Sequence, residues 1–208
     1  MKIFYLSRIL PLGLLILWSS LFAQPLRVSL EDVGQLLSHN PCTRGNFVQE
    51  KYLPSINRSL TSSGTFLITA TEGIIWQTEK PYPSIMVVGR SHIGQGASPQ
   101  TMNRMDTGSN RLFMEFSHAI SAAFSGNIDT IRNVFHLTFS SQATQWQLFL
   151  EPKENTVAQM VKSIQLQGNT VLETVSMTEQ NGSTITYTFS NHSFSQEPTE
   201  YERQLLQK

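Results

Sequence analysis

The residue types that carry most enzyme chemistry are sparse in this sequence, and they lack the spacings that catalysis or metal binding needs. Five histidines are scattered along the chain: His39, His92, His118, His136 and His192. Only three aspartates occur, and there is neither a Gly-rich phosphate loop nor a nucleophile elbow. Protein metal sites draw on closely spaced His, Cys and carboxylate ligands. We therefore expect no metal, no cofactor and no catalytic residue, and predict that the protein is not an enzyme.

Cys42 is the single cysteine, so the chain cannot form an internal disulfide. A reactive thiolate needs a cationic or histidine neighbour that lowers its pKa, and His39 and Arg44 are near in sequence. The alternative is a small apolar filler in the core. We favour the filler, because nothing else in the sequence points to thiol chemistry.

The composition argues against a nucleic-acid partner and for an exported, β-rich protein. Fifteen basic residues balance 15 acidic ones, and only 14% of the 208 residues are charged. A nucleic-acid surface would need a basic stripe, which is absent. The length suits one domain with a substantial core. We expect a monomer.

The first residues have the features of a cleaved export signal. Lys2 and Arg8 precede the apolar run 9–18, and a small residue, Ala23, stands at the expected cut. The apolar run is shorter than the ~20 residues that a bilayer span needs, although an uncleaved anchor remains the alternative. We assign 1–23 as signal peptide, 24–208 as a single domain, and the location as the periplasm of a diderm bacterium. Cleavage leaves 13 basic residues against 15 acidic ones.

The first half of the mature chain predicts one helix followed by strands. Residues 26–37 show helical spacing, with Ser29 as the N-cap. Residues 44–52 predict a strand with Phe47 on one face, and 54–63 predict a polar turn. The stretch 64–88 predicts a hairpin and a third strand, joined through turn residues at Glu72 and Gly73.

In this hairpin stretch, alternation places apolar side chains together on one face. Phe66 and Ile68 share one face of the first strand, and Ile74 and Trp76 share one face of the second. The third strand adds Ile85 and Val87. Its register decides which face they take, since a slip of one residue reverses the assignment.

The remainder predicts an edge region, a helical segment and a second set of strands. Residues 98–110 predict a loop or edge. Residues 112–124 predict a helix with a wide apolar face, 128–135 a second short helix, and 156–160 a helical turn. Alternating apolar residues in 135–139, 146–150, 163–167, 172–178 and 185–189 predict antiparallel strands, and 198–208 predicts a frayed or weakly helical tail.

These elements predict an α+β, mainly β, fold in which the sheet is larger than its helical cover. Eight to eleven strands with an apolar face, covered by only two or three short helices, leave room for a ligand. Apolar area alone holds an acyl chain, at roughly 0.8 kcal/mol for each buried CH₂. The sequence therefore favours a lipid-binding cavity.

Several short motifs follow one another in a recognisable order. They are Asn46-Phe47-Val48-Gln49, Gly64-Thr65-Phe66, Ile75-Trp76 and Lys80-Pro81, followed by Phe124-Ser125-Gly126-Asn127, Trp146-Gln147-Leu148, Glu151-Pro152-Lys153 and 164–169. In this order they resemble the LolA-like periplasmic lipoprotein carriers. The resemblance implies an unclosed antiparallel β-barrel, a half-barrel of about eleven strands, with a helical lid over an apolar cavity. It also implies an inner-membrane ABC transporter that supplies the lipoprotein and an outer-membrane acceptor. One departure is Ala70, which stands where the best-studied branch has an Arg that latches the lid.

We expect the cavity to be lined from both the sheet and the lid. The expected lining residues are Phe47, Phe66, Ile68, Ile74, Trp76, Ile85, Val87, Phe113, Phe116, Ile120, Phe124, Phe135, Leu137, Trp146 and Leu148. A non-catalytic regulatory module on the same half-barrel, which binds a protein, is the alternative. A hydrolase that uses His118 and His136 is a third, weaker option.

Overall fold

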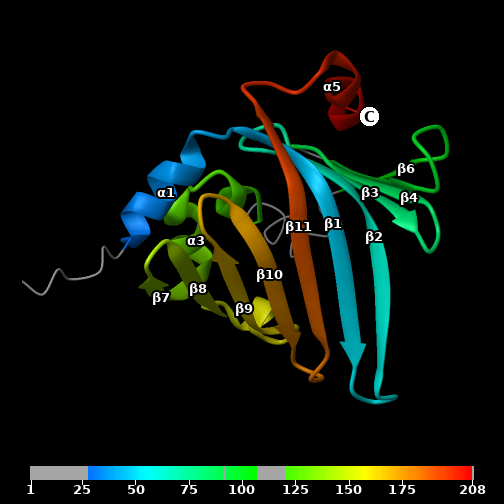
Figure 1. Cartoon of the computed structure of the whole chain (residues 1–208). Helices are drawn as coiled ribbons and strands as arrows, with labels where there is room; N and C mark the ends of the chain where they lie inside the picture. The colour runs from blue at the N-terminus through cyan, green and yellow to red at the C-terminus, as the bar shows by residue number, and fades with distance from the viewer. Residues whose placement is uncertain (1–27, 91, 107–119, 208) are drawn as a thin grey trace, which may run out of the picture.

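The computed structural model describes residues 28–90, 92–106 and 120–207, and within these the fold is one curved antiparallel sheet with short helices (Figure 1). The 11 strands lie in the order β6-β5-β4-β3-β2-β1-β11-β10-β9-β8-β7. They are β1 (Cys42–Leu53), β2 (Arg58–Thr69), β3 (Ile74–Lys80), β4 (Ser84–Val88), β5 (His92–Gly96), β6 (Asn103–Asp106), β7 (Phe135–Gln142), β8 (Gln145–Pro152), β9 (Val161–Gly168), β10 (Leu172–Glu179) and β11 (Thr184–Ser195). The sheet is not closed, which confirms the predicted half-barrel.

The two halves of the chain join where β1 pairs with β11. Within each half, β1–β6 and β7–β11, consecutive strands pair as antiparallel neighbours, as short connections favour. The pairing of β1 with β11 brings Phe47 opposite Phe189. This contact spans most of the chain, and it turns two antiparallel meanders into one sheet.

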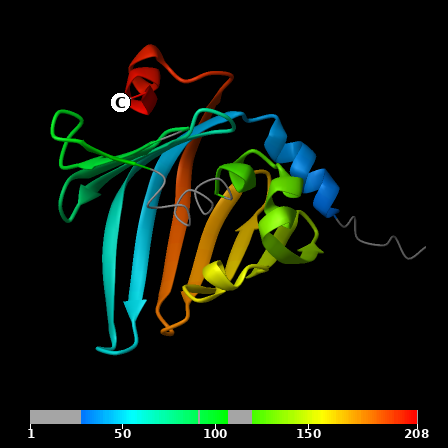
Figure 2. The same cartoon turned by 180° about the vertical axis from the view of Figure 1, so that it is seen from behind.

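Short helices cover parts of both faces of the sheet. They are α1 (Leu30–Ser38), α3 (Ile128–Val134), α4 (Asn155–Ala158) and α5 (Glu200–Gln207), and residues 120–124 are also helical. Figure 2 shows segment 120–124 and α3 inside the curve of the sheet, with α5 apart from them at the upper end. No helix in the described ranges is long and apolar enough to cross a membrane.

The start of α1 confirms the predicted N-cap. The Asp32 amide donates to the Ser29 hydroxyl, and the Asp32 carboxylate accepts from the Ser29 amide, which completes a capping box. The Asp32 carboxylate also accepts from the Ser29 hydroxyl, and the hydrogen bonds from this hydroxyl and from the Ser29 amide lower the pKa of Asp32. The helix then buries Val33 and Leu37 against the core.

The β2–β3 hairpin has the predicted facing of side chains. Phe66 pairs with Trp76, and Ile68 pairs with Ile74. The turn is closed by the Thr69 hydroxyl, which accepts from the Glu72 and Gly73 amides.

The predicted polar turn over 54–63 was wrong in length, because β2 already begins at Arg58. Apart from the exposed Leu60, the extra residues are polar, and they pair with the exposed half of β1, from Leu53↔Arg58 to Val48↔Ser63. Strand pairing continues there without an apolar face, and a hydrophobic pattern does not report such pairing.

Candidate functional site

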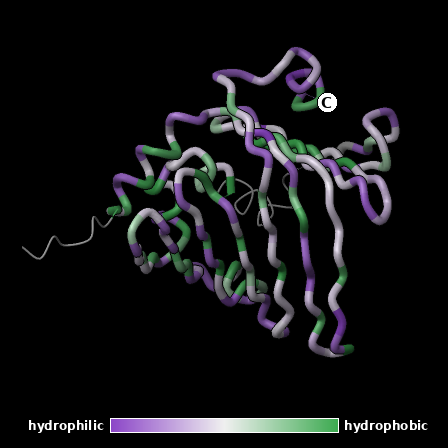
Figure 3. Tube along the Cα trace, viewed as in Figure 1, coloured by the Kyte–Doolittle hydropathy of each residue, from purple (hydrophilic) through white to green (hydrophobic). Residues whose placement is uncertain are grey.

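The sheet has two apolar faces that belong to different clusters. The inner face carries Phe47, Phe66 and Trp76 and lies under segment 120–124. The outer face carries Ile75 and Val87 and lies under α5. Figure 3 shows the underlying alternation as apolar and polar segments that follow each other along the strands.

Six rings on the inner face form a group that we call the aromatic cluster: Phe47, Phe66, Trp76, Phe124, Tyr187 and Phe189. Ring centroids lie 4.1 Å apart for Phe47 and Trp76, 5.2 Å for Phe66 and Phe189, and 5.2 Å for Trp76 and Tyr187. These separations suit tilted and edge-to-face packing. Burial, with a smaller contribution from Glu179, raises the pKa of Tyr187 to about 12, so its hydroxyl stays neutral.

Phe124 is the member of the cluster that the sheet does not supply. It ends the helical segment 120–124, and its ring lies 5.4 Å from that of Phe66 and 5.0 Å from that of Phe189. Only 4% of its surface is exposed. We call this segment and α3 together the lid. The lid therefore covers the inner face and adds one buried ring to the cluster.

The lid is also attached to α1. A Cβ placed on Gly34 of α1 would lie 3.1 Å from the Gly126 carbonyl oxygen, so the two backbones approach closely. Arg132 of α3 pairs with Glu31 at 3.2 Å, although both side chains are largely exposed, and such pairs contribute little. The lid is thus fixed on its α1 side by close packing.

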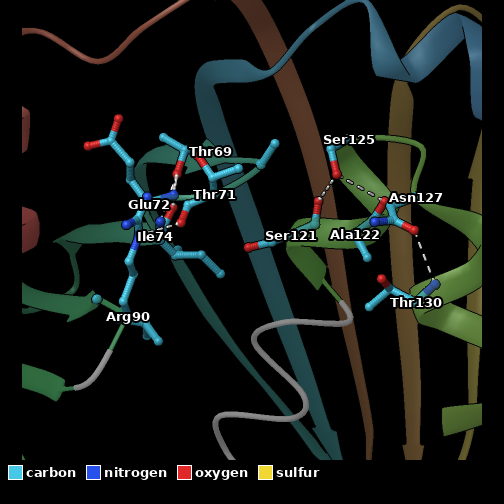
Figure 4. A pocket seen from close by; sticks show the side chains of 14 residues that line it. Thr69, Thr71, Glu72, Ile74, Arg90, Ser121, Ala122, Ser125, Asn127 and Thr130 are labelled. Carbon is cyan, nitrogen blue, oxygen red and sulfur yellow. Dashed lines mark hydrogen bonds between the residues drawn. The ribbon is translucent and has the colours of Figure 1, made fainter. Parts of the chain in front are cut away.

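A cavity of about 300 Å³ lies between the lid and the end of the sheet where the β2–β3 turn and the β4–β5 connection lie. Figure 4 shows the β2–β3 turn and Arg90 on one side, and Ser121, Ser125, Asn127 and Thr130 on the other. Ala70, at the position of the lid-latching Arg in the best-studied carriers, lines this cavity. Its methyl group offers no hydrogen bond to the lid.

The outer face is covered by α5 through two leucines and an ion pair. Leu205 and Leu206 are buried beside Cys42. Arg44 holds Glu202 with two hydrogen bonds, of 2.7 and 2.6 Å. The Arg44 hydrogen bond is the main cause that lowers the pKa of Glu202 to about 2. A second hollow, of about 390 Å³, lies beside this pair and exposed Tyr201.

The family comparison matches the part of the chain that builds this site. Residues 41–201 match the family model described as outer membrane lipoprotein carrier protein LolA. The chain belongs to the LolA family. The matched residues include the 11 strands of the described sheet and the lid. All six residues of the aromatic cluster therefore lie within the matched range 41–201.

Solved structures add distant similarities, and a search of curated proteins finds no match. A LolA superfamily protein, NE2245 from Nitrosomonas europaea, is 10% identical, with 82% of this chain and 96% of that chain covered and a TM-score of 0.45. An outer membrane lipoprotein-sorting protein domain from Vibrio parahaemolyticus is 8% identical (88% and 98% covered, TM-score 0.46). The Pseudomonas aeruginosa MucA/MucB complex gives 10% identity (84% and 60% covered, TM-score 0.43).

Most of the expected lining residues lie together in or against the inner-face cluster. They are Phe47, Phe66, Ile68, Ile74, Trp76, Ile120, Phe124, Phe135, Leu137, Trp146 and Leu148. Phe113 and Phe116 lie outside the described residues. Whether these side chains contact a ligand stays a prediction.

Ile85 and Val87 were assigned to the wrong face. They pair with Gln77 and Ile75 and pack in the outer cluster under α5. Their neighbours Met86 and Val88 face inward instead, opposite Trp76 and Ile74. The strand Ser84–Val88 is apolar on both faces because both are covered, so alternation gives no signal for the register.

Sequence reasoning missed Tyr187 and Phe189 as members of the site. Both were visible as alternating apolar residues of one strand, but their place beside Phe47 depends on the pairing of β1 with β11. No local pattern specifies a contact between residues 140 positions apart.

Proposed function

We propose that this protein is a non-catalytic periplasmic carrier that holds the acyl chains of a lipoprotein, or of a related lipid, on its inner face. Membership of the LolA family supports a role of this kind. The observation that carries the proposal is the aromatic cluster, to which the lid contributes the one ring of Phe124. An apolar sheet face that is covered by a short helical lid suits an apolar ligand.

In the described conformation the cluster packs against itself, so binding requires the lid to withdraw. Phe47 and Phe66 are buried, with 1% and 3% of their surfaces exposed. An acyl chain that buries ten methylenes gains about 8 kcal/mol, from which the costs of opening and of association are subtracted. The carrier would thus hold its cargo by apolar contacts that replace the contacts of Phe124.

The proposed route follows from the family. The protein would be exported by the signal at 1–23, receive its cargo from an inner-membrane ABC transporter, and release it to an outer-membrane acceptor. Neither step needs a reactive side chain. In the described part of the chain, no group of three or more His, Cys, Asp or Glu side chains is placed to hold a metal ion.

Native mass spectrometry of the periplasmic protein, purified without detergent, tests the proposal. We expect adducts with the masses of acylated lipid, and we expect the protein to keep a purified lipoprotein from aggregating. A variant with Trp76→Asp should lose both properties, whereas Phe149→Asp, on the outer face of β8, should keep both. A wild-type protein that neither carries lipid nor protects a lipoprotein would refute the carrier function.

A protein-binding module is the second candidate, and the packed state of the cluster favours it. The outer-face hollow beside Tyr201, which is 60% exposed, offers a surface for a protein. If this candidate is correct, Tyr201→Ala should abolish binding of the partner protein. The inner-face variant Trp76→Asp, provided it folds, should leave that binding unchanged.

A further inference from the structure

The cavity between the lid and the β2–β3 turn, which we call the seam cavity, combines polar side chains with an apolar floor. One wall consists of the β2–β3 turn, at residues 69–74, and the β4–β5 connection, at 88–90. The other wall consists of Ser121, Ala122 and Ser125 with Asn127 and Thr130. Its volume of about 300 Å³ suits a small polar group and not a whole lipid.

The hydrogen bonds of each wall stay within that wall. On the sheet side, Thr69 closes its turn, and the Arg90 Nε donates to the Thr71 carbonyl oxygen at 3.0 Å. On the lid side, the Ser125 hydroxyl donates to the Ser121 carbonyl oxygen at 2.8 Å, and the Thr130 amide donates to Asn127. Within the described ranges, no hydrogen bond or ion pair joins one wall to the other.

The lid is therefore held by α1 and by the aromatic cluster, but not by hydrogen bonds across the seam cavity. It is packed against α1 at Gly126 and inserted into the aromatic cluster at Phe124. At the seam cavity, the β2–β3 turn places Ala70 on the side that faces the lid. A ligand that bonds to both walls would add the missing connection.

The walls offer one cation and several hydroxyl donors to such a ligand. The hydroxyls of Thr71, Ser121 and Thr130 line the cavity together with the guanidinium of Arg90. The two terminal nitrogens of Arg90 make no hydrogen bond or ion pair within the described residues, which leaves four N–H groups for a ligand. Glu72 is the acidic residue of the lining, and Figure 4 shows its carboxylate directed away from the lid.

The floor of the cavity connects this polar site with the inner face. Ile74, Val88 and Ala122 are buried there, and all three also belong to the inner-face cluster. A molecule with a polar head in the seam cavity would therefore have its acyl chain directed toward the aromatic cluster. This arrangement matches an amphiphile and not a free ion.

We propose that the seam cavity binds the anionic headgroup of the lipid whose acyl chain lies on the inner face, and that the headgroup bridges lid and sheet. A phosphate or carboxylate accepts from Arg90 on the sheet side and from the hydroxyls of Ser121 and Thr130 on the lid side. The bound headgroup thereby holds the lid closed over its own acyl chain. This inference rests on the proposed carrier function and names the class of lipid.

Two lysolipids with the same myristoyl chain test the proposal in the full mature protein, below their critical micelle concentrations. We expect lysophosphatidylglycerol to bind about tenfold more tightly than zwitterionic lysophosphatidylcholine, as one charge-assisted contact implies. Arg90→Gln should reduce this preference to less than twofold, and Ser121→Ala should reduce it about threefold. Arg58→Gln, which removes an exposed arginine at the far end of β2, should leave it unchanged.

The possible outcomes separate this inference from the carrier function. If both lysolipids bind equally to the wild type, or if Arg90→Gln keeps the preference, the headgroup site is wrong while the carrier function stands. If neither lysolipid binds the wild type, the result contradicts the carrier function on which this inference rests. Inorganic phosphate serves as the probe for a free anion. If millimolar phosphate binds alone and abolishes the preference, the cavity is a site for a free anion, which overturns the headgroup assignment.

Discussion

Replacement of Phe124 by alanine separates the role of the lid ring from that of an ordinary core residue. Phe124 is 4% exposed, and its ring packs against Phe66 and Phe189 on the sheet. Core Phe→Ala changes cost about 3–5 kcal/mol, less where the surroundings can close around the void. We expect a loss of about 3 kcal/mol in the free energy of unfolding, because a short lid helix can settle inward.

The same change should strengthen lipid binding. A ligand that binds only the open form pays for opening, and its apparent Kd falls as the open fraction rises. If the contacts of Phe124 supply about 3 kcal/mol to the closed form, their removal raises the open fraction up to about 100-fold. We therefore expect binding at least about tenfold tighter in Phe124→Ala than in the wild type.

Urea unfolding and titration with a fluorescent fatty acid measure the two effects. Leu67→Ala is the matched control, because Leu67 is also 4% exposed but packs in the outer cluster of the sheet and not on the inner face. It should lose similar stability with unchanged affinity. If Phe124→Ala binds the fatty acid no more tightly than the wild type, despite the loss of stability, the lid mechanism is refuted.

Three further predictions concern the outer face and the hairpin. The folded-state pKa of Glu202 is lowered to about 2 from 4.5, so the Arg44 pair stabilises fully above pH 4.5 and is lost as the pH falls toward 2. Because the pair is only partly buried and water still screens it, Glu202→Gln should remove about 1 kcal/mol of this pH-dependent stability in urea unfolding. Leu206→Ala should cost about 2–3 kcal/mol and raise the rate at which Cys42, now 1% exposed, reacts with a thiol reagent. Gly64→Ala should cost about 3 kcal/mol in thermal or urea unfolding, since its Cβ would collide with the Gln77 carbonyl oxygen.

Each of these has a control on the same element. Glu200→Gln, whose side chain is 74% exposed on α5, should leave the acid sensitivity intact. Equal acid profiles for Glu202→Gln and the wild type would show that the ion pair is not the cause. Tyr201→Ala should not accelerate labelling of Cys42, and slow labelling in Leu206→Ala would mean that α5 does not shield the thiol. Ser62→Ala, on β2, should be nearly neutral; a similarly neutral Gly64→Ala would rule out the close approach.

Local patterns were sufficient for elements that have one covered face and clear end signals. Ser29 specified the start of α1, and Phe66, Ile68, Ile74 and Trp76 were placed on one face by alternation alone. These features depend on neighbours a few residues away, which the sequence displays directly.

Features that depend on distant elements were less accessible. Leu205 and Leu206 of α5 cover the outer face of the sheet, where Ile85 and Val87 pack. Because this face is covered too, β4 carries apolar residues on both faces, and its sequence does not show which residues face inward. The tail was expected to be frayed or weakly helical, since two adjacent leucines in a charged segment give a weak signal. Phe189 lies beside Phe47 because β1 pairs with β11, and the sequence does not display that pairing.

Fluorescence quenching by a brominated acyl chain tests the central claim most directly. In the mature Trp146→Phe protein, Trp76 is the remaining tryptophan, and it lies within the aromatic cluster. A fatty acid brominated in mid-chain quenches a tryptophan only on contact, so saturation should quench most of the Trp76 emission. The control carries its single tryptophan on the outer face, as Phe149→Trp with Trp76→Phe and Trp146→Phe, and should remain bright. If the acid binds and Trp76 keeps its full emission, acyl chains do not occupy the inner face.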